Sequence, residues 1–332
     1  CDSANGKIMR FPFLFILSLC IASFAHAQEG TDTLASFSDA EQEAEYQSFY
    51  VAEEDEETMG KAIVQGGSNG KVNTRPTNTN NNAPCKMWAI LVADTYDENI
   101  GEDDAYDNLA LNKELKAIAQ CLGIEVSITN ITANRAYNKR NLANAISNLK
   151  PAQNDIVFFC FNGHGFRWDD QKDMYPNICM IGPEDDVYGN YVATTDIYNA
   201  IKAKGARLSV VITDCCNSKF GEYGPRQKEN TLYSRTNTRV SKKRMQELFL
   251  GTKGVILATA AKPGEYAWAF DGTGSAFTQS FIAQLRKEAS STQTEAPNWQ
   301  RLVDNAIESA RRKTTSCENT QHGMRYMSIS KK

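Results

Sequence analysis

An excess of positive charge is missing from this sequence. Its 332 residues include 36 Lys and Arg against 40 Asp and Glu, which gives a net charge of -4. Because no basic field is present to attract phosphate groups, we expect no nucleic-acid partner. Cysteine is also sparse, since nine residues in a chain of this length fall far below the density of a disulfide-held scaffold. A packed hydrophobic core must therefore stabilise the fold.

A hydrophobic run long enough to cross a membrane is missing as well. The apolar stretch over residues 11–24 is shorter than the ~20 residues that a transmembrane helix needs. It follows Arg10 and ends in Ala25-His26-Ala27, a pattern typical of a secretory signal peptide. We expect cleavage after residue 27, a secreted, periplasmic or extracellular protein, and no stable membrane insertion afterwards. A membrane anchor and lipidation at Cys20 are weaker alternatives.

Residues 28–84 are predicted to precede the folded part of the chain. An acidic leader includes the cluster Glu53-Glu54-Asp55-Glu56-Glu57, and a segment rich in Gly, Asn and Thr follows it. Such compositions have too little periodic apolar content to form a core. The predicted organisation is an upstream extension and signal peptide at 1–27, an acidic leader and linker at 28–84, and one folded domain at 85–332.

Beyond residue 84, short runs of β-branched and aromatic residues alternate with longer helical patterns. This alternation is typical of an α/β fold, in which helices cover both faces of a mostly parallel sheet. The predicted strands are 87–93, 124–129, 156–162, 208–214 and 255–260. The predicted helices are 108–121, 139–149, 195–204, 278–289 and 299–313.

Two predicted strands lead into residues that can carry chemistry. The runs 156–161 and 208–213 are almost continuously apolar, as expected for central parallel strands buried on both faces. The first leads into Asn162-Gly-His-Gly165 and the second into Asp214-Cys-Cys-Asn217. Ligands and catalytic groups of open α/β sheets collect beyond the carboxyl ends of the strands. We therefore expect a histidine and a cysteine at one edge of the sheet.

Histidine is the scarcest of these groups, with three residues in the chain. His26 is removed with the signal peptide, which leaves His164 and His322. His164 lies between two glycines directly after a buried strand, where a substrate can approach, whereas His322 near the C-terminus has no such setting. A turn histidine that only ends the strand is the alternative for His164.

An imidazole beside a thiol makes a nucleophile. A thiol with a pKa of about 8.5 is mostly protonated at neutral pH, so an imidazole that takes its proton supplies the reactive thiolate. The same imidazole then protonates the leaving amine. The backbone N–H groups of Gly165 and Cys216 are suited to stabilise the oxyanion. Buried thiols, a vicinal disulfide or metal ligation are the alternatives for Cys215 and Cys216.

These strand ends resemble the caspase and metacaspase superfamily of cysteine peptidases, including the bacterial caspase-like peptidases. In that family a Gly-His-Gly turn supplies the histidine, and a later strand ending in Asp-x-Cys supplies the nucleophile about fifty residues downstream. Here 52 residues separate His164 from Cys216, and residues 255–268 and 274–278 also resemble the family. The resemblance extends from Met87 to about the C-terminus.

This resemblance implies a caspase-like, mostly parallel sheet of about six strands sandwiched between helices. It implies Cys216 as the nucleophile of a cysteine endopeptidase that acts on protein or peptide substrates, with no required cofactor. Metacaspases usually carry Asp-Ser-Cys-His-Ser-Gly around the nucleophile, where this chain has Asp214-Cys-Cys-Asn-Ser-Lys219. We therefore expect a divergent subfamily.

The resemblance also implies a substrate preference. Caspases hold aspartate with an arginine in the first specificity pocket, whereas metacaspases hold arginine or lysine with acids. Residues 85–134 contain no arginine, while four aspartates crowd this region: Asp97, Asp103, Asp104 and Asp107. We expect Asp214, by its match to a metacaspase pocket acid, and Asp107 to bind the substrate, with cleavage after Arg or Lys. A solvated acidic loop is the alternative for the four acids, and Asn112-Lys113 stands where the family would offer a second pocket acid.

The polar stretch 219–249 is predicted to hold a self-cleavage site, because relatives divide there into two subunits. A solvated or partly helical insertion is the alternative. Its basic residues include Arg226, Lys228, Arg235, Arg239 and Arg244.

Acids between residues 169 and 186 could bind calcium as in some metacaspases. Their spacing matches no calcium motif, so a surface loop is the favoured interpretation and no metal site is predicted.

The sequence leaves two other function classes open. One is a non-catalytic binding protein that keeps the fold, and the other is a Cys/His amidase acting on a small substrate, because a fold alone does not choose among these reactions.

Overall fold

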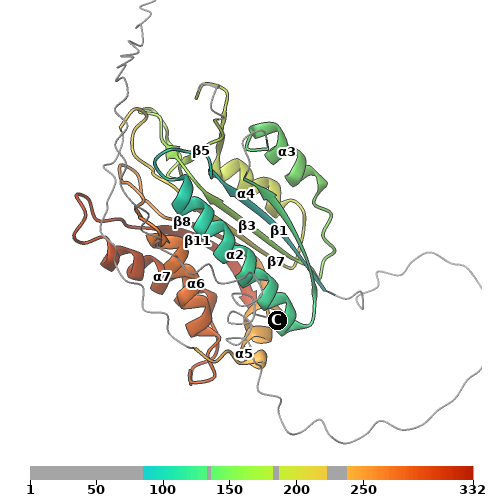
Figure 1. The fold of residues 1–332 in the computed structure, drawn as a ribbon. Helices are drawn as coiled ribbons and strands as arrows, with labels where there is room; N and C mark the ends of the chain where they lie inside the picture. Colours follow the sequence, from blue (N-terminus) through green and yellow to red (C-terminus); the bar gives the residue numbers. More distant parts are fainter. Residues whose placement is uncertain (1–84, 133–135, 182–186, 223–237, 332) are drawn as a thin grey trace, which may run out of the picture. The chain divides into compact units, whose positions relative to one another are not determined.

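The computed structural model describes residues 85–132, 136–181, 187–222 and 238–331 (Figure 1). The predicted extension, signal peptide, leader and linker lie outside the described residues. Within the described ranges, no helix combines the length and the apolar character needed to span a bilayer.

Six strands form the central sheet. In sheet order they are β11 (Met324–Lys331), β8 (Thr252–Thr259), β7 (Leu208–Asp214), β3 (Ile156–Asn162), β1 (Lys86–Ala93) and β2 (Glu125–Ile131). Every neighbouring pair is parallel except β11 and β8. Every residue of β3 and β7 is buried, which is why their sequences are almost continuously apolar.

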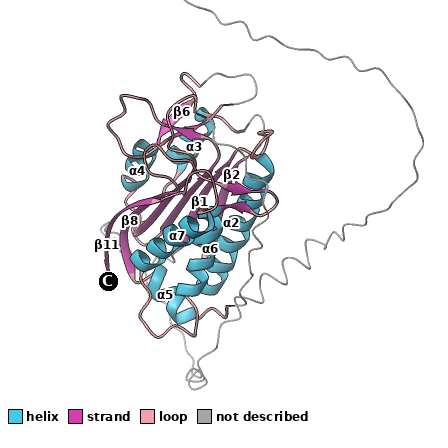
Figure 2. Cartoon of the chain, turned by 90° about the vertical axis from the view of Figure 1, so that its left-hand side faces the viewer, coloured by secondary structure: helices cyan, strands magenta, loops and turns pink. Residues whose placement is uncertain are grey.

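Helices cover both faces of this sheet (Figure 2). One face carries α2 (Gly101–Leu122), α5 (Lys242–Phe249), α6 (Ala276–Glu288) and α7 (Trp299–Lys313). The other carries α3 (Lys139–Asn148) and α4 (Thr194–Lys202). Successive side chains of β3 point to opposite faces of the sheet, since Phe158 packs with the first group of helices and Phe159 with the second. The predicted α/β sandwich of three layers is therefore confirmed.

Two small sheets complete the described elements. β4 (Gly165–Phe166), β5 (Asn177–Cys179) and β6 (Tyr191–Ala193) form an antiparallel sheet that begins directly after His164. β9 (Ala269–Phe270) pairs with β10 (Gly274–Ser275), which leads directly into α6. Both small sheets therefore belong to connections at the carboxyl edge of the central sheet.

The strand β11 is absent from the predicted strands, although the other five are confirmed. It is an edge strand, and none of its residues is fully buried. Met327 and Ile329 pack against the core from one side only, and Tyr326 is 48% exposed. A strand with little burial carries a weak sequence pattern, because burial is what selects the apolar residues.

Helix α2 begins at Gly101 rather than at residue 108, so it includes three of the four aspartates for which a solvated loop is the alternative. Asp103, Asp104 and Asp107 are at most 4% exposed. A solvated acidic loop is therefore wrong for these three residues. Acidic residues in a first helical turn interact favourably with the helix dipole, and the Gly272 N–H donates to Asp103 from a distant loop at 3.0 Å.

The end of the polar stretch 219–249 is packed rather than solvated. Val240 and the α5 residues Met245, Leu248 and Phe249 are buried. The Arg244 guanidinium donates to the Glu288 carbonyl oxygen at 2.9 Å and to that of Gln293 at 3.0 Å. The middle of the stretch, residues 223–237, lies outside the described residues.

An ion pair between α2 and α6 is the basis of a stability prediction. Arg286 Nη2 and Nε lie 2.6 and 2.9 Å from Glu114 Oε2, and the Glu114 side chain is 2% exposed. We expect Arg286→Ala to lower the free energy of unfolding by about 3–5 kcal/mol, because it leaves a buried carboxylate without this partner. Chemical denaturation measures the change. Arg311→Ala, which removes an exposed pair with Glu308, is the control, and equal effects of both variants would contradict the argument.

Candidate active site

The segments that follow β3 and β7 remain in register beyond the ends of the strands. Within the sheet, β3 pairs with β7 at a constant offset of 52 residues. An isolated bridge between Arg167 and Lys219 keeps the same offset further on. His164 and Cys216 are also 52 residues apart. They therefore occupy matching positions in one parallel register at the carboxyl edge of the sheet.

Gly165 brings these two segments into close backbone contact. A Cβ atom at this position would lie 2.5 Å from Cys215 Sγ and 2.6 Å from the Cys216 carbonyl oxygen. Both distances are too short for any side chain, so the close approach requires glycine. The predicted oxyanion donors, the N–H groups of Gly165 and Cys216, thus belong to adjoining backbone segments, and their catalytic role stays a prediction.

Cys216 is half-buried, with its sulfur against the loop that follows β8. The Ala267 N–H donates to Cys216 Sγ at 3.4 Å, and the Ala267 carbonyl oxygen lies 3.7 Å from the same atom. Burial raises the pKa of Cys216 to about 11, against the opposing effect of the Ala267 hydrogen bond. In the resting molecule this residue is therefore a neutral thiol.

Cys215 lies in a different environment from its neighbour. It is 1% exposed and packs in the hydrophobic cluster on the α3 and α4 face of the sheet. Neither Cys215 nor Cys216 is in a disulfide, so the alternative of a vicinal disulfide is wrong. The Cys215 thiol thus lies in the core, whereas the Cys216 thiol lies at the edge of the sheet.

His164 is held by Asp97, a residue of the loop between β1 and α2. His164 Nε2 lies 3.0 Å from Asp97 Oδ2, while Asp97 Oδ1 accepts the N–H groups of Asn99 and Ile100 at 2.7 and 3.0 Å. Burial alone would lower the pKa of His164, but the hydrogen bond and charge of Asp97, together with the charge of Asp94, raise it above 6.5. Burial likewise opposes the ionisation of Asp97, yet the hydrogen bond and charge of His164 lower its pKa to about 2. A carboxylate thus orients the imidazole and stabilises its protonated form.

This role of Asp97 is missing from the sequence-based prediction, which counts the residue only among four aspartates near the expected specificity pocket or in a solvated loop. One signal could have found it: the loop leaves β1 at the same carboxyl edge as His164 and Cys216. Its contact with the histidine depends on a fold that brings residues 67 positions apart together.

Asp214 and Asp107, the two predicted substrate-binding acids, are both buried and both contact the start of α6. Asp214 Oδ2 accepts the Thr278 N–H at 2.8 Å and the Thr278 hydroxyl at 2.7 Å. Asp107 Oδ2 accepts the Ser275 N–H at 2.8 Å, and its Oδ1 accepts Gln279 Nε2 at 2.6 Å. Both Asp107 oxygens are occupied, so its contacts favour an anchor for α6 over the predicted role in substrate binding.

Two buried carboxylate oxygens close to this cluster have no hydrogen-bond partner among the described residues: Asp104 Oδ2 and Asp214 Oδ1. Burial, followed by the charges of Asp107 and Asp94, raises the pKa of Asp104 well above its usual value. Burial also raises the pKa of Asp214. Lys313 is the nearby base, but burial lowers its pKa to about 8 despite the opposing charge of Asp107. A cationic ligand would donate hydrogen bonds to these two oxygens and reduce the repulsion between the neighbouring carboxylates.

His322 is also tied to the site, although its sequence context shows nothing of this kind. Its Nδ1 lies 2.9 Å from Glu265 Oε1, and its N–H donates to Glu265 Oε2 at 2.8 Å. The Glu265 carbonyl oxygen accepts the N–H of Asn217, the residue after Cys216, at 2.9 Å. His322 therefore helps to fix the loop that holds the Cys216 sulfur.

Two acids of the calcium hypothesis have partners within the protein. Asp169 pairs with Lys219 at 3.1 Å, and Asp173 Oδ1 accepts the Tyr175 N–H at 3.1 Å. The other candidate acids at 184–186 lie outside the described residues. In the part of the chain that the structure describes, no group of three or more His, Cys, Asp or Glu side chains is arranged to hold a metal ion.

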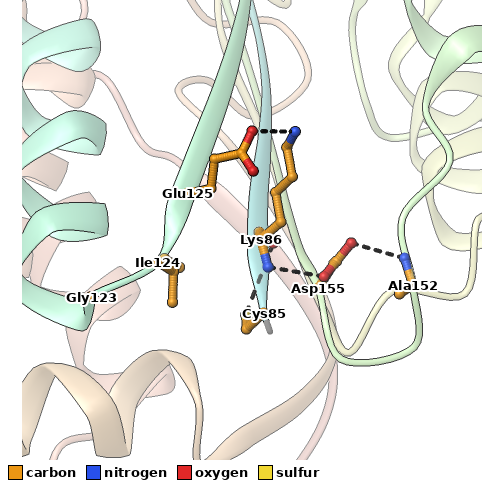
Figure 3. Close-up of a pocket in the computed structure, with 7 residues that line it drawn as sticks. All are labelled: Cys85, Lys86, Gly123, Ile124, Glu125, Ala152 and Asp155. Carbon is orange, nitrogen blue, oxygen red and sulfur yellow. Dashed lines mark hydrogen bonds and ion pairs between the residues drawn. The ribbon is translucent and has the colours of Figure 1, made fainter. Parts of the chain in front are cut away.

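A surface hollow lies at the opposite end of the sheet, where β1, β2 and β3 begin (Figure 3). Asp155 Oδ1 accepts the Lys86 N–H at 2.9 Å, and Asp155 Oδ2 accepts Trp88 Nε1 at 2.9 Å and the Ala152 N–H at 2.8 Å. The Lys86 ammonium pairs with Glu125 at 2.7 Å. Because its charged groups are already paired, this hollow has little to offer a polar ligand, and the candidate site is the carboxyl edge.

The chain is similar to known proteins with a caspase domain. No curated protein matches the chain. Among solved structures, the crystal structure of caspase-1 from Spodoptera frugiperda is similar, with 14% sequence identity, a TM-score of 0.42, and coverage of 79% of this chain and 94% of that chain. The family model of the caspase domain matches residues 100–326. Because that match includes more than half of the sequence, this chain belongs to the caspase-domain family of cysteine peptidases.

Proposed function

We propose that this chain is a cysteine endopeptidase in which Cys216 and His164 form the catalytic pair and cleavage follows Arg or Lys. The single observation that supports it best is the shared register of the two residues at the carboxyl edge of β3 and β7. Family membership supports the general class, since the caspase domain is a cysteine peptidase domain.

In the proposed mechanism the neutral thiol is deprotonated as it reacts. The Nε2–H of His164 donates to Asp97, which leaves Nδ1 free to act as the base. As the Cys216 sulfur bonds to the peptide carbonyl carbon, its proton moves to His164, and the Asp97 carboxylate stabilises the resulting imidazolium. The N–H groups of Gly165 and Cys216 hold the oxyanion.

Collapse of that tetrahedral species breaks the carbon–nitrogen bond. His164 gives its proton to the leaving amine, and the acyl group remains on sulfur as a thioester. Water then attacks the thioester with His164 as base, which restores the thiol and releases the acid product.

The preference for Arg or Lys rests on the unpartnered oxygens of Asp104 and Asp214. A guanidinium or ammonium group that reaches these oxygens would form charge-assisted hydrogen bonds in a buried setting. We therefore assign Asp214 and Asp104 to the first specificity pocket. Asp104 replaces Asp107 as the second acid, because both Asp107 oxygens already accept hydrogen bonds.

This assignment predicts opposite effects on activity and stability for Asp104→Asn. We expect kcat/KM for an Arg peptide to fall by about 30- to 100-fold, because one of the two buried charge partners is lost. Because the pKa of Asp104 is raised, the folded state holds the proton of this carboxyl group more tightly than the unfolded state does. The free energy of unfolding therefore falls as the pH rises above 3.8. At pH 7 the variant should therefore melt about 2–4 °C higher than wild type, and this gain should vanish near pH 4.

The control for this prediction is Asp196→Asn, which changes an exposed acid on α4 at the far face of the sheet. It should leave the Arg activity unchanged and should not raise the melting temperature, because Asp196 interacts favourably with the dipole of α4. Full Arg activity in Asp104→Asn would remove Asp104 from the proposed pocket.

The decisive experiment compares wild type with Cys216→Ala on fluorogenic peptides that end in Arg, Lys, Asp or Leu before the reporter. We expect turnover of the Arg and Lys peptides by wild type alone. Cleavage only after Asp or small apolar residues would refute the proposed specificity.

The same preparations separate the two competing function classes. A non-catalytic binding protein would leave Cys216 unlabelled by an Arg-based electrophilic peptide, whereas a peptidase would be labelled at that sulfur. An amidase of small substrates would hydrolyse simple amides but not unfolded protein.

Export and self-cleavage complete the proposal. Export rests on the signal-peptide pattern, and sequencing of secreted protein should find Gln28 as the first residue. Self-cleavage rests on the basic residues of the 219–249 stretch. We expect no cleavage after Arg244, because its guanidinium donates to the backbone carbonyls of Glu288 and Gln293. Cleavage after Arg226, Lys228 or Arg235 is expected, and intact-mass spectrometry of the active enzyme tests it.

A further inference from the structure

Five aromatic rings gather beside the proposed catalytic pair, and we call them the aromatic platform: Phe166, Trp168, Tyr188, Tyr191 and Phe220. Trp168 stacks on Tyr188 with ring centroids 5.7 Å apart, and Phe220 lies 4.9 Å from Trp168 and 5.2 Å from Phe166. Phe166 is buried against Trp168, Tyr191 and Phe220. Tyr188 is 68% exposed and Phe220 is 38% exposed. The platform thus presents aromatic surface to solvent on a packed base.

The platform is fixed to the same two segments that carry the catalytic residues. Phe166 and Trp168 follow His164 closely, and Phe220 follows Cys216 in the same way. Between them the Phe220 N–H donates to the Arg167 carbonyl oxygen at 2.9 Å. The rings therefore hold a set position relative to the reacting sulfur and imidazole.

The platform and the acidic pocket lie on different sides of the catalytic pair. Asp214 and Asp107 bond to residues at the start of α6, which lies on the α2 face of the sheet. The platform belongs to the β4–β6 sheet and its continuation, and Figure 2 shows β6 next to α3 and α4 of the opposite face. A substrate whose basic side chain enters the acidic pocket would therefore extend its leaving-group side toward the platform, on the side of the histidine that protonates the amine.

We propose that the aromatic platform binds an apolar or aromatic side chain of the substrate, in the first three residues after the cleaved bond. This proposal rests on the proposed function and adds a second specificity determinant to it. Exposed aromatic rings offer a large apolar area and stack on other rings, so they favour Phe, Tyr, Trp or Leu over Gly. The charged side chains at the rim are engaged, since Lys219 pairs with Asp169 at 3.1 Å and the Lys139 ammonium lies over Tyr191 at 5.8 Å from its ring centroid.

The test uses two sets of peptides with Arg before the cleaved bond. One set carries Phe at the first, second or third position after it, and the other carries Gly at all three. Mass spectrometry gives kcat/KM for each peptide with wild type, Phe220→Ala, Tyr188→Ala and the control Tyr326→Ala. Tyr326 is an exposed tyrosine on the edge strand β11. We expect wild type to prefer one Phe peptide over Gly by about tenfold, the two platform variants to lose this preference, and Tyr326→Ala to keep it.

An equal preference for Phe in wild type and both platform variants would overturn the proposal. If wild type cleaves neither kind of peptide, the proposed function fails. A binding measurement then tests the aromatic platform by itself. Fluorescence titration of Cys216→Ala with the two peptides should still show tighter binding of the Phe peptide, weakened by Phe220→Ala. Equal binding of both peptides would refute the proposal, as would a shift from dimer to monomer in Phe220→Ala, because the rings would then be a contact between two copies of the chain.

Discussion

Cys216→Ala should lower kcat/KM for an Arg peptide by at least about 10⁴-fold, because the variant has no atom to form the covalent thioester. The loss should come without a large change in stability, since the sulfur is half-buried at the edge of the sheet and makes its hydrogen-bond contacts with the Ala267 backbone. Kinetics with the fluorogenic peptide and thermal unfolding of the same sample measure both quantities.

Cys215→Ala is the matched control, because it removes the adjacent sulfur. This thiol is buried in the core on the α3 and α4 face, so we expect a loss of about 1 kcal/mol in the free energy of unfolding and activity close to wild type. If Cys215→Ala abolished turnover and Cys216→Ala retained it, the nucleophile would be Cys215 rather than Cys216.

Asp97→Asn is the second change for which we expect a large effect, about 10²- to 10⁴-fold in kcat. The carboxylate accepts the Nε2–H of His164, and an amide in its place can turn an N–H toward that nitrogen and favour the wrong tautomer, as happens in Ser-His-Asp enzymes. The charge that raises the pKa of His164 is also lost. Activity rises with pH as His164 loses its proton and becomes able to act as the base. This limb of the pH–rate profile should therefore move to lower pH in the variant.

Two further measurements separate this positioning role from a purely structural one. Glu98→Gln, an exposed neighbour in the same loop, should leave kcat and the pH profile unchanged. The pKa of Asp97 is lowered to about 2, so Asp97 stabilises the fold above pH 3.8 and this contribution is lost as the pH falls through about 2. The variant should accordingly lose less stability than wild type between pH 4 and pH 2. A fall in kcat with an unshifted pH profile would contradict the proposed role.

The parts of the site that could be predicted from sequence are those that adjoin buried strands. The apolar runs of β3 and β7 are strong patterns because both faces of each strand are covered, and the residues after them follow directly. The placement of His164 and Cys216 at one edge depends only on these strands being parallel neighbours, which the structure confirms.

The contacts of Asp97 and Asp104 could not be predicted in the same way. Aspartates near the start of a helix are usually solvated, and nothing local distinguishes these from exposed ones. Asp103 and Asp107 are buried because β10, its preceding turn and the start of α6 pack over α2, with partners about 170 residues away in the chain. The sequence likewise gives no sign of the contact of His322, because its partner Glu265 is 57 residues away in the chain and adjacent in space.

The neutral state of the Cys216 thiol affects how the protein would survive outside a cell. Peroxides and disulfides react with the sulfur anion and far more slowly with its protonated form. With a pKa of about 11, the resting sulfur is almost entirely protonated at neutral pH. Such an enzyme would keep its nucleophile reduced in oxidising surroundings and expose a reactive anion only for the moment when a bound peptide is attacked.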